Sequence, residues 1–245
     1  MTNDDLLSEA VLDNAAWCVG VWRSHGLAVE RRLGLVACVG EPPRFYPNAV
    51  AIDADADPDA QAAWLTELAA RTPGSMSIKD SFAALDLAPA GFTRLFDADW
   101  IGRPAMSGRG GVAAPWEWRL IESEAELTDW EVAWAGPAAA GAPRVFRPEL
   151  LADRGVGFLA GYRRGELLAG CILTPTGGVV GIGNVFGPYE AAVDIAATMF
   201  PDRTIVGYEQ GEDLRRAMDC GFHRLGRLTV WSRPGSPSNI SDNLS

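Results

Sequence analysis

The stretch Val206-Gly-Tyr-Glu-Gln-Gly211, followed by Cys220-Gly-Phe222 and Val230-Trp231, is the most informative part of this sequence. Its first residues form a short apolar run that is typical of a buried strand. The segment between the two glycines has helical spacing, and Gly221 just past its end can adopt the left-handed conformation that closes many helices. The run through Val230-Trp231 again has the character of a strand. We therefore predict a strand, a helix, a turn and a strand in this order.

The same order of elements occurs about 130 residues earlier in the chain. Met76-Ser-Ile78 aligns with Val206-Gly-Tyr208, and Gly91-Phe92 aligns with Gly221-Phe222. The other matching features are Asn48–Ile52 with Gly178–Ile182, Pro58 with Pro188, Arg94-Leu95 with Arg224-Leu225, and strands that carry Trp100 and Trp231. A fixed spacing between similar segments is the signature of an internal repeat. We interpret the chain as two related α/β halves.

Each half also begins with an expected helix. From about Asp4 to Arg23 apolar residues recur on one face, and Gly26 closes the segment. Glu124–Trp134 repeats this pattern in the second half. Tryptophans at helical spacing are expected in the core rather than on a ligand platform.

The second half continues with the strand-like segments Gly157–Tyr162, Leu167–Thr174 and Val179–Phe186. A β-hairpin followed by β-α-β-α-β resembles the fold of the GNAT superfamily of acyl-CoA-dependent N-acyltransferases. The strand, helix and Gly-Phe turn of residues 206–222 are similar to those that close many GNAT domains. The resemblance covers residues 116–233, and residues 1–104 resemble a degenerate copy.

We therefore expect an α/β (α+β) fold with two GNAT-like mixed β-sheet halves flanked by helices. The expected domains are residues 1–104, a linker at 105–115, an acyltransferase domain at 116–233 and a disordered tail at 234–245. The linker contains Ser107-Gly-Arg-Gly-Gly111. This cluster is also compatible with a phosphate loop, but it lacks the lysine of a Walker motif and does not match G-x-G-x-x-G.

The resemblance implies a V-shaped split between the strands that end near Phe186 and Glu209. There the pantetheine arm of acyl-CoA pairs with an exposed strand edge. Unpaired backbone groups on splayed strands are suitable partners for an amide-bearing arm. On this basis Asn184, Val185 and Phe186 are expected to line the arm of acetyl-CoA or another acyl-CoA, and Gly187 is expected to open onto its pyrophosphate.

Two features depart from the family pattern. Members usually carry a basic, glycine-rich loop of the form Q/R-x-x-G-x-G/A after this strand, whereas Phe186–Ala191 has one glycine, no basic residue and an acidic Glu190. Many members carry a tyrosine that protonates the departing thiolate, five residues before the Gly-Phe phenylalanine; Ala217 stands there in this chain. Tyr208 and Tyr189 are alternative proton donors. A shorter or carrier-protein-bound thioester is an alternative acyl donor.

Acyl transfer to an amine needs a base for the ammonium proton. Glu209 is the expected base, because burial at the end of a core strand would raise its pKa; a helix cap or an arginine partner is the structural alternative. Tyr208 is the second catalytic candidate, although strand alternation would direct it into the core.

In the first half, Lys79 and Asp80 either line a cleft for the acceptor or form a structural pair. His25 is interpreted as a helix C-terminal residue.

The net charge of −11 argues against nucleic acid as a partner, because phosphate binding needs a basic surface. A strip of four arginines could still meet a phosphate, although a solvated surface is the simpler interpretation: Arg215, Arg216, Arg224 and Arg227. No long apolar run or basic leader is present, which indicates a cytoplasmic protein without a membrane segment. Four isolated cysteines and two histidines predict no metal site.

Three classes of function fit these features. The leading prediction is an acyltransferase that uses acyl-CoA or a related thioester and acts on a small-molecule amine. The second is a GNAT-fold binding module that has lost the pyrophosphate loop and the activity. The third, transfer from aminoacyl-tRNA by a tandem GNAT-like protein, conflicts with the acidic charge.

Overall fold

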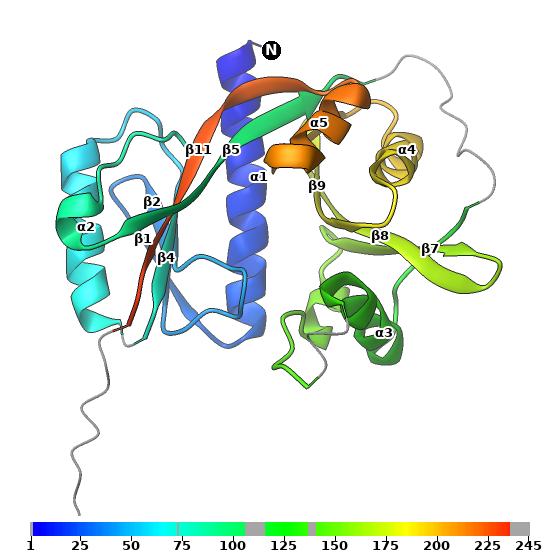
Figure 1. The fold of residues 1–245 in the computed structure, drawn as a ribbon, viewed down its shortest axis with the longest axis horizontal. Coiled ribbons are helices and arrows are strands. Elements are labelled where there is room, and N and C mark those ends of the chain that lie inside the picture. Colours follow the sequence, from blue (N-terminus) through cyan, green and yellow to red (C-terminus); the bar gives the residue numbers. More distant parts are fainter. Residues whose placement is uncertain (1, 73, 106–115, 137–140, 236–245) are drawn as a thin grey trace, which may run out of the picture.

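The computed structural model describes residues 2–72, 74–105, 116–136 and 141–235. These residues form one 11-stranded mixed β-sheet with helices packed against it (Figure 1). The strand order is β1-β2-β3-β4-β11-β5-β10-β9-β8-β7-β6. The expected linker, apart from residue 105, and the expected tail, apart from residues 234 and 235, lie outside the described residues. The domain boundaries therefore stay a prediction.

Both halves contain a helix, three strands, a helix, a strand, a short helix and a strand in this order, and the second half also has a strand before its first helix and a 3-10 helix after it. The first half consists of α1 (Asn3–Ser24), β1 (Ala28–Arg32), β2 (Leu35–Val39), β3 (Ala49–Ala51), α2 (Pro58–Arg71), β4 (Met76–Asp80), the 3-10 helix η1 (Ala88–Ala90) and β5 (Thr93–Arg103). The second consists of β6 (Glu117–Leu120), α3 (Glu124–Ala135), the 3-10 helix η3 (Pro148–Ala152), β7 (Gly157–Arg163), β8 (Glu166–Thr176), β9 (Val179–Phe186), α4 (Tyr189–Met199), β10 (Thr204–Glu209), α5 (Gly211–Asp219) and β11 (His223–Arg233). The α/β fold expected from the sequence is confirmed.

The last strand of each half lies within the sheet of the other half. β5 lies between β10 and β11, and β11 lies between β4 and β5. The two exchanged strands are antiparallel, and Ala98 is opposite Leu228. These residues are 130 positions apart, which is the offset of the repeat, so this pair lies where a pseudo-two-fold axis would pass. The halves are thus joined by a continuous hydrogen-bonded sheet, which crosses the middle of Figure 1.

The long helix α1 ties the two halves together from one face of the sheet (Figure 1). Its first turn is closed by a capping box between Thr2 and Asp5. Trp22 is fully buried, and its Nε1 donates to the Pro47 carbonyl at 3.0 Å. His25 is the C-cap residue, and its Nε2 lies 2.8 Å from the Val145 carbonyl of the second half. His25 is therefore a structural residue.

The glycine turns occur where the repeat predicts them. Gly91 has φ 81° after η1, and Gly221 has φ 86° after α5. The phenylalanine that follows each glycine is buried, at Phe92 and Phe222. Glycine adopts this left-handed conformation without the steric cost that a side chain would add, so the chain reverses there and returns to the sheet.

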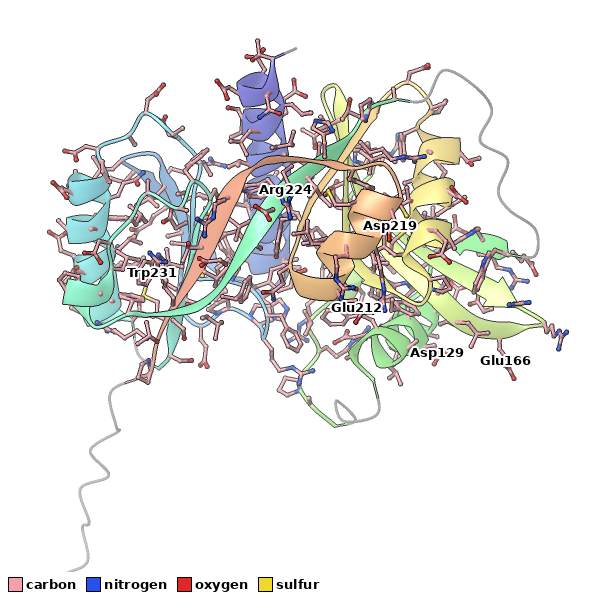
Figure 2. The ribbon with its side chains drawn as sticks, turned by 45° about the horizontal axis from the view of Figure 1, so that its top comes forward. Asp129, Glu166, Glu212, Asp219, Arg224 and Trp231 are labelled. Atoms are coloured by element: carbon pink, nitrogen blue, oxygen red, sulfur yellow. The ribbon has the colours of Figure 1, made fainter. Side chains whose placement is uncertain are left out.

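The arginine strip is largely neutralised by carboxylates. Arg216 lies 2.8 Å from Glu212, and Arg224 on β11 lies 3.0 Å from Asp99 on the adjacent β5 (Figure 2). Arg227 is 3.6 Å from Asp97.

Within the described part of the chain, no cluster of three or more His, Cys, Asp or Glu side chains could hold a metal ion, and no helix has the length and apolar character needed to cross a membrane.

Candidate functional site

The adjacent parallel strands β9 and β10 separate at their carboxyl ends. Pairing joins Val179–Gly181 to Thr204–Val206 and goes no further. The rest of β9 stays with β8, where Phe186 is opposite Gly170. The rest of β10 stays with β5, where Glu209 is opposite Asp99. Each strand thus follows its outer neighbour, and a split opens between them.

A β-bulge accompanies this divergence. Between the pairs Gly170–Phe186 and Ile172–Gly183, β9 contains one residue more than β8. Asn184 lies in the bulge with φ 52°, a left-handed conformation that asparagine tolerates better than most residues. A bulge bends the strand that carries the extra residue and interrupts its regular pairing. The local sequence of β9 therefore favours separation from β10.

A cavity of about 500 Å³ occupies the split. All six site residues predicted from the sequence line it: Asn184, Val185, Phe186, Gly187, Tyr208 and Glu209. The cavity also has walls that the sequence did not reveal, from α1 (Asn14, Trp17, Cys18) and from the loop before β3 (Phe45, Tyr46, Pro47). Cys18 lies on the apolar face of the first helix, which indicated only core packing, and no sequence motif marks the other five residues. The first half therefore completes a cavity that begins in the second.

Glu209 has the electrostatics of a general base. Burial, together with the nearby Asp213 carboxylate, raises its pKa from 4.5 to about 7, while the Tyr189 hydroxyl acts in the opposite direction. Neither structural alternative is observed: the α5 N-cap is Gln210, and Glu209 makes no ion pair within the described part of the chain. A carboxyl group with a pKa near neutrality can accept and release a proton under physiological conditions.

Tyr189 and Tyr208 both line the cavity, and the hydroxyl of Tyr189 lies near this carboxyl group. Tyr189 opens α4, is buried, and has a raised pKa caused by burial and by the charge of Glu209. Its hydroxyl forms no hydrogen bond of regular geometry with the described residues. Tyr208 packs edge-on against Trp100 with ring centroids 5.4 Å apart, as core packing requires, and it also lines the cavity, so its catalytic role stays a prediction. Ala217 is fully buried and supplies no donor.

Lys79 and Asp80 do not form the structural pair considered above. The Lys79 ammonium donates to Asn14 Oδ1 at 2.7 Å and lines the cavity. The Asp80 carboxylate instead accepts hydrogen bonds from backbone N–H groups, including that of Leu85 at 2.9 Å. Successive residues of a strand point to opposite faces, which separates these two charges. The geometry of Lys79 agrees with the interpretation in which its side chain lines a cleft for the acceptor.

The end of the cavity at Gly187 is less suited to a diphosphate than a basic, glycine-rich loop would be. Gly187 has φ 77°, and a Cβ there would overlap the Leu168 carbonyl, so the tight turn needs glycine. The following helix α4 has no side-chain N-cap, which leaves N–H groups and a positive dipole end for an anion. However, its first turn carries Glu190, and Arg216 of the cavity is already paired with carboxylates.

No protein-family model matches the sequence, and comparison with curated proteins finds no match. Several solved structures do share the fold. A GCN5-related N-acetyltransferase from Kribbella flavida is 15% identical with a TM-score of 0.62, over 93% of this chain and 96% of that one. A GCN5-related N-acetyltransferase from Sphaerobacter thermophilus is 14% identical with a TM-score of 0.53, over 86% of this chain and 77% of that one.

A third similar structure is a tandem GNAT protein from the clavulanic acid biosynthesis pathway. It is 14% identical with a TM-score of 0.51, over 84% of this chain and 79% of that one. Identities this low establish the fold and no residue's role. The chain thus has the GNAT fold in a tandem arrangement, as the resemblance implied.

Proposed function

We propose that this protein transfers an acyl group from a thioester to the nitrogen of a small-molecule amine. The observation that supports this function best is the split between β9 and β10, which leads into a cavity that contains a carboxyl group with a pKa of about 7. Unpaired strand backbone provides partners for an extended amide-bearing arm, and Glu209 provides a base.

The donor is acyl-CoA or a shorter thioester of the same pantetheine type. The bulged segment Asn184–Phe186 would pair with the arm, because its inner edge has no partner strand. The cavity fits this arm better than the diphosphate of CoA, because Glu190 opposes an anion at the helix terminus. We therefore expect acetyl-pantetheine to be used at least as well as acetyl-CoA.

The chemistry assigned to the chain has two proton transfers. Glu209 removes one proton from the acceptor ammonium, and the free amine nitrogen attacks the thioester carbonyl carbon. A C–N bond forms, the C–S bond breaks, and the second nitrogen proton ends on the departing sulfur. The Tyr189 hydroxyl is proposed to relay this proton, since it is buried in the cavity wall beside Glu209.

The test is acyl transfer to a panel of amines with acetyl-CoA and acetyl-pantetheine as donors. Glu209→Gln should lower kcat/KM by about 10²–10⁴-fold, and the wild-type rate should rise with pH until about pH 7 as Glu209 ionises. Glu166→Gln, a change at the exposed first residue of β8, is the matched control. A full rate for the folded Glu209→Gln protein would refute the assignment.

A binding module without activity is the second candidate. The buried Ala217 in place of a tyrosine and the acidic Glu190 favour it. A ligand that binds the native state raises the melting temperature whether or not it reacts. A shift with acetyl-CoA or acetyl-pantetheine, but no product with any amine of the panel, would favour this alternative.

A further inference from the structure

Lys79 is the only lysine in the sequence; the other 20 basic residues are arginines. Its side chain is nevertheless buried, with 4% of the residue exposed. Burial of an ammonium group is costly unless charged or polar groups compensate it. A single buried lysine at the wall of a cavity therefore needs a physical explanation.

The groups around Lys79 compensate its charge only in part. Its Nζ donates to Asn14 Oδ1 at 2.7 Å and lies 4.2 Å from the centre of the Tyr208 ring. An ammonium group has three N–H donors, and no carboxylate of the described residues lies within ion-pair distance of it. The buried acids nearby are otherwise engaged, since Asp13 accepts from Thr174 and Asp80 accepts from backbone N–H groups.

Lys79 also lines a second cavity, of about 650 Å³, which adjoins the first. The two cavities share five residues: Phe45, Tyr46, Pro47, Lys79 and Tyr208. Beyond this boundary the second cavity has an apolar wall formed by Pro42, Pro43, Met76, Leu95, Phe96 and Val230. Its remaining lining residues are polar or charged: Glu41, Arg44, Asn48, Ser75, Ser77 and Ser232. A molecule in it would have its polar end at the boundary with the first cavity.

The charges of this second cavity favour an anionic ligand. Its charged lining residues are Arg44, Lys79 and Glu41, two cations and one carboxylate. This local excess of positive charge contrasts with the net charge of −11 of the whole protein. A single ammonium without a carboxylate partner matches one carboxylate, and an apolar wall matches a hydrocarbon body.

We propose that the second cavity is the acceptor site and that Lys79 binds a carboxylate of the acceptor. The acceptor class is then a primary amine that carries a carboxylate and an apolar side chain. This inference rests on the proposed acyl transfer. Lys79 lies at the boundary of both cavities and Glu209 lines the first, so an acceptor whose carboxylate is held at Lys79 would direct its amine into the cavity that contains the base.

The test compares amino acids with their carboxamides, which differ in the carboxylate alone. The probes are leucine and leucinamide, and phenylalanine and phenylalaninamide, with binding measured by calorimetry in the absence of any donor. Wild-type protein should bind the carboxylates at least about 10-fold more tightly, because charge-assisted hydrogen bonds contribute this much. Lys79→Met should abolish the preference, and Lys79→Arg should restore part of it.

Arg163→Met, which removes an exposed cation of β7, is the matched control and should keep the preference. Lys79→Gln serves as a second neutral variant if the methionine variant does not fold. Equal binding of acid and amide by the wild type, no binding of any acid probe, or an unchanged preference in a folded neutral variant would overturn the inference.

The two proposals fail separately. A carboxylate preference that depends on Lys79, without acyl transfer from any donor, would retain the site and reject the transferase. Acyl transfer to amines irrespective of a carboxylate would retain the transferase and reject the role of Lys79.

Discussion

Glu209→Gln should make the protein more stable at alkaline pH, even though it removes the proposed base. The pKa of Glu209 is raised from 4.5 to about 7 in the folded protein, and one pKa unit corresponds to about 1.4 kcal/mol. The folded state thus binds this proton more tightly than the unfolded chain does. The resulting stability is present below pH 4.5, decreases between pH 4.5 and 7, and is absent above that range.

Glutamine has nearly the same shape and cannot ionise. The variant should therefore match the wild type near pH 4 and exceed its free energy of unfolding by about 3 kcal/mol at pH 8. Urea unfolding at a series of pH values measures this difference, with unchanged m values as evidence of equal exposure on unfolding. The other carboxyl groups with a raised pKa, Asp13 and Asp80, are present in both proteins and cancel in the comparison.

Glu166→Gln serves as the control, because this exposed glutamate is the first residue of β8, lies at the end of the β7–β8 hairpin (Figure 2) and does not line the cavity. Its substitution should change stability by only a few tenths of a kcal/mol, about the usual size for a surface position. The reasoning is refuted if the difference between Glu209→Gln and wild type is constant from pH 4 to pH 8. A decrease with rising pH would refute it as well.

Three further predictions concern the surroundings of the cavity. Burial raises the pKa of Asp13 from 3.8 to about 6, so Asp13→Asn should increase the free energy of unfolding at pH 8 by about 3 kcal/mol and change it little at pH 4; an equal effect at both pH values would contradict this. Gly181→Ala should lower the free energy of unfolding, measured with urea, by about 2–4 kcal/mol, because a Cβ at this position would overlap the side chains of Asp13 and Thr174. Gly178→Ala is the control and should be tolerated. Tyr189→Phe should reduce kcat by about 10²-fold without loss of melting temperature, since its hydroxyl forms no regular hydrogen bond; an unchanged kcat would remove it as the proton relay.

Much of the fold follows from local patterns in the sequence. Strand runs such as Val206–Tyr208 and left-handed glycines such as Gly221 depend on neighbouring residues alone, and the repeat places their counterparts near Ile78 and Gly91. The positions of Glu209 and of Asn184–Gly187 at one cavity follow from the expected fold, because the ends of adjacent parallel strands meet at one edge of a sheet. Local order was sufficient for the strand runs and the glycine turns, whereas the site residues were placed by the resemblance to the GNAT fold.

The partners of the exchanged strands depend on the tertiary structure. β5 and β11 are the last strands of similar halves, and either could have paired within its own half; their exchange depends on hydrogen bonds between residues about 130 positions apart. The same long-range packing brings Asn14 of α1 to Lys79 of β4 and leaves this ammonium without a carboxylate. Strand alternation explains why the adjacent Asp80 faces away, but only the packed sheet brings Lys79 to the boundary of two cavities.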